Sequence, residues 1–122
     1  MKIATLFYIC FLCARISTAE APVIACNLKA IAPAERQRYD ELTKRVRAAV
    51  RERRELADGF TYKMDGKAIT LPETAEWLSL ERQCCPFLTF QLSVAGKESD
   101  WGLSLTGPAG VKALLTAEFP AR

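Results

Sequence analysis

Histidine is missing from this chain of 122 residues. Without an imidazole, one chain cannot build Ser-His-Asp or Cys-His catalysis, and it cannot form a zinc site of the Cys/His kind. The cysteines also lack the repeated C-x-x-C spacing of structural zinc sites. The glycine-bearing segment 106–110 lacks the lysine of a phosphate loop. These absences exclude several common catalytic classes, and the sequence indicates no enzymatic activity.

The chain also has little excess of charge. Its net charge is +3, which does not demand an acidic partner. Half of the residues (50%) are apolar and 25% are charged, as in ordinary globular proteins, and there is no internal repeat. A chain of this length supports one hydrophobic core.

A short apolar run lies close to the first residue. Residues 3–14 are apolar apart from one threonine, which is too short to span a bilayer and typical of a signal peptide. Small residues follow at Ala19 and Ala21, where cleavage would occur. We therefore expect a signal peptide over residues 1–21 and one domain over residues 22–122, in an exported or periplasmic protein. No membrane span is expected once the leader is removed.

Arg15 supports the alternative interpretation of the same segment, because signal peptides are usually neutral between the apolar core and the cleavage site. In that case the start codon is mis-assigned, the protein begins near Cys26 and it stays in the cytoplasm. Cys10 and Cys13 lie inside the apolar run, so we assign them to the leader rather than to a redox or zinc motif.

Periodicity predicts six elements after the leader, and each predicted strand has only one apolar face. An α+β fold follows, in the order α-β-α-β-β-α, with a small, mainly antiparallel sheet covered on one face by helices. The predicted helices are 33–56, 71–84 and 107–119, and the predicted strands are 60–64, 87–94 and 101–105.

Specific residues define the ends and faces of these elements. The first helix carries an apolar stripe that runs from Tyr39 to Val50, and Asp58-Gly59 is expected to stop it. Thr70 and Glu73 match a capping box at the start of the second helix. In strand 87–94 we expect the alternating apolar side chains to point inward; they are Leu88, Phe90, Leu92 and Val94.

Three cysteines remain in the predicted domain, and they are its candidate functional residues: Cys26, Cys84 and Cys85. Soft ions such as mercury(II), copper(I) or arsenic(III) prefer sulfur ligands. The sequence therefore favours a small domain that binds a soft metal ion through Cys84 and Cys85, with Cys26 as the third ligand. No other cofactor is expected.

Two alternatives use the same cysteines. In the first, Cys26 forms a disulfide with Cys84 or Cys85, which makes the protein a stapled structural or binding module without catalysis. In the second, the protein is a thiol-disulfide redox protein. Adjacent side chains on a regular helix diverge by about 100°, so convergence of Cys84 and Cys85 requires the helix to end there, as Pro86 predicts.

The electrostatics of that helix end oppose a thiolate. The carboxyl end of a helix carries partial negative charge, which disfavours a second negative charge. Arg82 or a bound cation would have to offset it.

The segment Glu81-Arg82-Gln83-Cys84-Cys85-Pro86-Phe87, followed by Leu105-Thr106-Gly107-Pro108, resembles a motif set of small uncharacterised bacterial domains. Related segments occur in heavy-metal response proteins, including extensions of mercury-type regulators of the MerR class. The resemblance covers residues 24–119 and implies a link to metals, but no particular activity. The chain departs from those regulators in its apolar leader and in lacking their DNA-binding module.

The first predicted helix is rich in arginine, which raises the question of nucleic-acid binding. Acidic residues interleave with the basic ones along residues 33–56, and no base-reading motif accompanies them. We interpret this helix as a solvated surface and expect no nucleic-acid partner.

Overall fold

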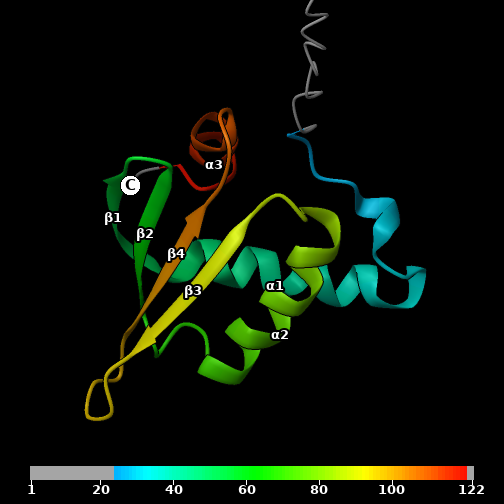
Figure 1. The fold of residues 1–122 in the computed structure, drawn as a ribbon. Helices are drawn as coiled ribbons and strands as arrows, with labels where there is room; N and C mark the ends of the chain where they lie inside the picture. Colours follow the sequence, from blue (N-terminus) through cyan, green and yellow to red (C-terminus); the bar gives the residue numbers. More distant parts are fainter. Residues whose placement is uncertain (1–23, 121–122) are drawn as a thin grey trace, which may run out of the picture.

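A computed structural model describes residues 24–120, and its three α-helices and four-stranded antiparallel sheet confirm the predicted α+β class (Figure 1). The predicted signal peptide lies outside the described residues. Two short 3-10 turns, Leu28–Ala30 and Pro33–Glu35, precede the first helix. The helices are α1 (Arg36–Ala49), α2 (Leu71–Cys84) and α3 (Val111–Glu118), and the strands are β1 (Val50–Leu56), β2 (Gly59–Met64), β3 (Thr89–Val94) and β4 (Trp101–Thr106).

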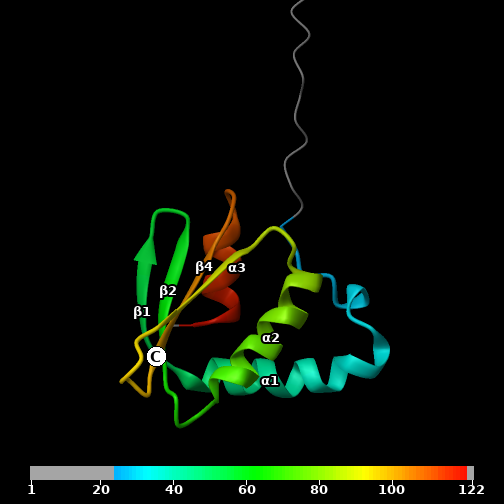
Figure 2. The same ribbon diagram turned by 60° about the horizontal axis from the view of Figure 1, so that its bottom comes forward.

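The sheet has the strand order β1-β2-β4-β3, so β2 and β4 form its centre and β1 and β3 its edges. Alternate side chains of β2 and β4, such as Tyr62 and Leu103, are buried on one face of the sheet. The rings of Tyr62 and Trp77 both contact the ring of Phe119, which directly follows α3. One core therefore lies between the sheet and its helices (Figure 2).

The first predicted helix is too long, and the difference is an additional strand. Helix α1 ends at Ala49, and residues Val50–Leu56 pair with β2 as a hairpin edge. The charged residues of this segment have high helix propensity, but the pairing of the segment with β2 outweighs it. Asp58-Gly59, predicted to stop a helix, instead lies where β1 is joined to β2: Ala57 and Asp58 form the turn, and Gly59 begins β2.

The prediction that four apolar residues of strand 87–94 all point inward is wrong for two of them. The strand, β3, lies at an edge of the sheet. Leu88 is buried and Phe90 is half-buried, but Leu92 and Val94 are exposed. The last two apolar residues of this edge strand are exposed despite their alternation, so alternation alone could not predict their burial. In β4 the predicted alternation is confirmed, since Trp101, Leu103 and Leu105 are all buried.

Helix α2 is fixed at both ends, and this positions the cysteine pair. The predicted capping box is present, because the Thr70 hydroxyl accepts from the Glu73 amide at 3.3 Å and the Glu73 carboxylate accepts from the Thr70 amide at 3.0 Å. In its middle, the Trp77 indole donates to the Thr43 hydroxyl of α1 at 3.1 Å. The helix ends at Cys84, as the following Pro86 predicts.

Arginines of α1 are paired with acidic residues of neighbouring helices. Arg38 reaches Glu76 of α2 at 2.7 Å, and Arg47 pairs with Glu118 of α3. These pairs tie the helices together along their exposed sides. In the part of the chain that the structure describes, no helix combines the length and the apolar character that crossing a membrane requires.

Candidate functional site

The segment before α1 crosses to the carboxyl end of α2, where two bonds hold it. The amide of Asn27 donates to the carbonyl of Cys84 at 3.0 Å, and Cys26 forms a disulfide with Cys85 across a Cα–Cα distance of 5.1 Å. Ile31, five residues after Cys26, is fully buried in the core. The disulfide thereby joins residues 59 positions apart in the sequence.

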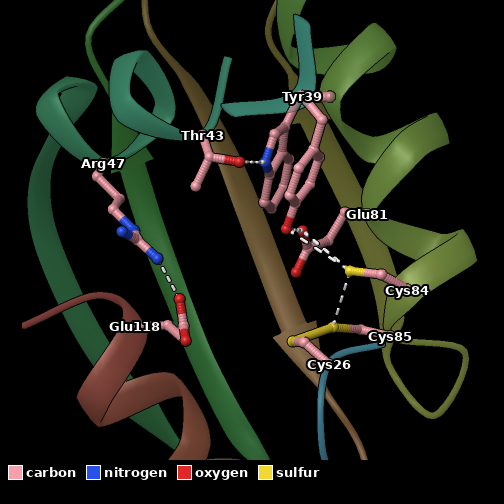
Figure 3. Close-up of a disulfide and its surroundings, with 9 residues drawn as sticks. Cys26, Tyr39, Thr43, Arg47, Glu81, Cys84, Cys85 and Glu118 are labelled. Carbon is pink, nitrogen blue, oxygen red and sulfur yellow. Dashed lines mark hydrogen bonds and ion pairs between the residues drawn. A yellow bond between two sulfur atoms is a disulfide. The ribbon is translucent and has the colours of Figure 1, made fainter. Parts of the chain in front are cut away.

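The structure brings the three predicted cysteines together, and Cys84 is the one that keeps its thiol. The Cys84 and Cys85 sulfurs are 3.5 Å apart. The ligand atoms of Cys26, Glu81, Cys84 and Cys85 all lie within 4.8 Å of one another, which is close enough for one metal ion to bind them (Figure 3). Cys26 is half-buried, whereas the other three are buried.

Adjacent cysteines converge here because the second one leaves the helix. Cys84 is the last helical residue, and Cys85 has φ −124° and ψ 65°, outside the helical region. Its amide still donates to the Glu81 carbonyl at 2.8 Å, so the cysteine remains fixed to the last turn. The sulfur of Cys85 can therefore face both Cys84 and the segment that carries Cys26.

A tyrosine and a carboxylate complete the site (Figure 3). The Tyr39 hydroxyl of α1 donates to the Glu81 carboxylate at 2.6 Å and lies 3.6 Å from the Cys84 sulfur. Burial, followed by the hydrogen bond to Glu81, raises the pKa of Tyr39 well above its ordinary value. Tyr39 therefore stays protonated and acts as a hydrogen-bond donor at neutral pH.

The surroundings of the sulfurs disfavour additional negative charge. Burial raises the pKa of Glu81, although the Tyr39 hydrogen bond acts in the opposite direction. Burial also raises the pKa of the Cys84 thiol, and the charges of Glu81 and Glu118 add to this effect. A buried thiol of raised pKa is a poor nucleophile at neutral pH.

The charge of Arg47 opposes the rise in the Glu81 pKa without forming an ion pair with that carboxylate. None of the ion pairs found among residues 24–120 involves Glu81. Arg47 lies on the same side of the core, but it pairs with Glu118 (Figure 3). Arg82, considered from the sequence as the offsetting charge, is exposed and belongs to none of these pairs. The cluster thus combines buried sulfur with a buried carboxylate that has no ion-pair partner in the described part of the chain.

Sequence reasoning missed two members of the site. Glu81 precedes Cys84 by three residues and Cys85 by four, a spacing that places such residues on one side of a helix and could have indicated it. Tyr39 belongs to the apolar stripe predicted for the first helix, and no local pattern relates it to residues more than forty positions away.

Comparison of the chain with protein-family models, with curated proteins and with solved structures finds no match. The geometry and chemistry of the site are therefore the basis for inferring its function.

Proposed function

We propose that the reduced protein binds one soft metal ion through the sulfurs of Cys26, Cys84 and Cys85. The observation that supports this most strongly is the convergence of these sulfurs, together with a Glu81 oxygen, within 4.8 Å. Thiolates are the ligands that soft ions such as mercury(II) and copper(I) prefer. The chain has no histidine, so sulfur is the only soft ligand concentrated at this site.

The charge of the site supports the same proposal. Buried anionic groups are stable when a cation neutralises them, and a metal ion is often the largest local charge in such a site. Here Glu81 is only 6% exposed, and the three cysteines surround it without an arginine or lysine partner among the described residues. A soft cation bound by the sulfurs would offset the negative charge that three thiolates would otherwise add beside Glu81.

Metal binding and the disulfide compete for the same two sulfurs. Cys26 and Cys85 are joined in the structure, so they become ligands only after reduction. A dithiol reductant supplies the two electrons: its own thiols become a disulfide, and their two protons pass to the sulfurs of Cys26 and Cys85, which become thiols. We therefore assign metal binding to the reduced state and the closed, stapled form to the oxidised state.

Titration with mercury(II) tests this proposal. The protein is the full chain with Cys10→Ser and Cys13→Ser, which removes the two leader thiols from the experiment. Reduced protein is expected to develop ultraviolet sulfur-to-mercury absorption that saturates at one equivalent. Oxidised protein keeps a single thiol, at Cys84. It is expected to give a much weaker absorption when one equivalent of mercury(II) has been added.

The control is the same chain with Cys26→Ser, Cys84→Ser and Cys85→Ser added. An absorption change of equal size in this control, or no change in the reduced parent protein, would refute the proposal.

A second candidate, the stapled module without a ligand, is favoured by the Cys26–Cys85 disulfide itself. An exported protein would keep this disulfide, because extracellular and periplasmic compartments are oxidising. The third interpretation, a thiol-disulfide redox protein, has less support, since catalysis of that kind uses a thiol of lowered pKa and burial raises the pKa of Cys84.

A further inference from the structure

We infer that the site selects trivalent metalloids, arsenic(III) or antimony(III), over monovalent copper. This inference rests on the proposed function and concerns the charge of the bound ion. Cys84 and Cys85 are 0% exposed and Glu81 is 6% exposed, so any net charge left on the complex is largely removed from water. Burying an uncompensated charge is strongly unfavourable.

The charge of the complex depends on the ion. Three thiolates carry three negative charges, so they form a neutral complex with arsenic(III) or antimony(III). The same three thiolates leave one negative charge with mercury(II) and two with copper(I). When all three sulfurs bind, only the trivalent ions avoid placing a net charge in the buried site.

The groups that face the sulfurs make a negative complex still less favourable. Glu81 is adjacent, and the charge of Glu118 also acts on Cys84. The cluster lies at the carboxyl end of α2, which carries partial negative charge. Arg47 pairs with Glu118, and the Tyr39 hydroxyl is engaged with Glu81. That hydroxyl also lies 3.6 Å from the Cys84 sulfur, but a neutral donor shared with Glu81 offsets little of the charge of a dianionic copper complex.

Binding of arsenite leaves the charge of the site unchanged. Arsenite at neutral pH is As(OH)3, and three cysteine thiols react with it to form three As–S bonds. Three As–O bonds break, and each hydroxyl leaves as water with the proton of one thiol. Arsenic remains trivalent, so no oxidant or reductant is consumed after the disulfide has been reduced.

The arrangement of ligands suits three-coordinate arsenic. Trivalent arsenic keeps a lone pair and takes three ligands, which the three cysteines provide within 4.8 Å of one another. Glu81 is then not required as a ligand and can keep its 2.6 Å hydrogen bond from Tyr39.

Competition against dithiothreitol tests the selectivity, because this small dithiol offers the same ligand atoms fully in water. Reduced full-length protein with Cys10→Ser and Cys13→Ser is titrated anaerobically with arsenite and, separately, with copper(I). The measured quantity is the amount of ion bound to the protein divided by the amount bound to dithiothreitol. This ratio is expected to be at least about tenfold higher for arsenite than for copper(I). Native mass spectrometry should show a gain of one arsenic minus three hydrogens.

A charge variant tests the physical cause. Glu81→Gln removes the adjacent negative charge and keeps an acceptor for Tyr39. The variant should bind copper(I) more tightly, so the ratio of arsenite to copper(I) partitioning should fall several-fold. Glu98→Gln, in the exposed loop between β3 and β4, removes the same charge far from the cysteines and should leave the ratio unchanged.

The outcomes separate this inference from the proposed function. If mercury(II), copper(I) and arsenite all fail to bind, the proposed function is wrong. If mercury(II) or copper(I) binds while arsenite shows no preference over copper(I) relative to dithiothreitol, the selectivity is wrong and the thiolate site remains. A preference that does not respond to Glu81→Gln also overturns the inference, since its charge origin would be incorrect.

Discussion

Cys85→Ser is expected to remove both the disulfide and most of the metal affinity of the reduced protein. Cys85 occupies the middle of the cluster, bonded to Cys26 and 3.5 Å from the Cys84 sulfur. Loss of a residue that merely orients a ligand typically costs 10–100-fold in affinity, so loss of a ligand should cost at least about 100-fold. The measurement is competition for mercury(II) between the reduced protein and a small dithiol.

Cys84→Ser is the matched comparison, because Cys84 takes no part in the disulfide. This variant should keep the Cys26–Cys85 disulfide, detected as a linked peptide pair after non-reducing digestion, while losing affinity to a similar degree. Equal affinity of the parent protein and both serine variants would show that the sulfurs do not act together on one ion.

The second large effect concerns stability in the oxidised state. The disulfide joins residues 59 positions apart, and cross-linking a loop of this length restricts the unfolded chain. The chain-entropy relation gives about 4 kcal/mol of stabilisation for such a loop. Cys26→Ser should therefore lower the free energy of unfolding of the oxidised protein by up to about 4 kcal/mol, measured by urea denaturation.

Reduction supplies the control for this prediction. With a reductant present, the parent protein and Cys26→Ser should have nearly the same denaturation midpoint, because both lack the cross-link. Cys10→Ser and Cys13→Ser are kept in both proteins so that residues 10 and 13 cannot form disulfides with the remaining cysteines. Identical midpoints under oxidising conditions would contradict the stapling role.

Elements with a strong local signal could be predicted from the sequence. The capping box at Thr70 and Glu73, the helix end before Pro86 and the alternation in β4 each depend on residues close together in the chain. The error at the end of α1 has the opposite cause. Residues Val50–Leu56 favour a helix locally, and only their pairing with β2, a tertiary contact, makes them a strand.

In the site too, some features could be predicted from the sequence and others depend on tertiary contacts. Absence of histidine and the adjacent cysteines identified sulfur as the relevant chemistry, and the sequence could name Cys26 as a third member. Which cysteine pairs with Cys26 depends on how Cys85 leaves the helix, a backbone detail that composition does not specify. The contact of Tyr39 with Glu81 depends on how α1 and α2 pack, so it appears only in the folded structure.

X-ray absorption at the mercury edge is the most direct test of the proposed thiolate centre. The sample is reduced full-length protein with Cys10→Ser and Cys13→Ser, loaded with one equivalent of mercury(II). A first coordination shell of three sulfur atoms is the expected result. A shell dominated by oxygen or nitrogen would contradict the assignment of Cys26, Cys84 and Cys85 as ligands.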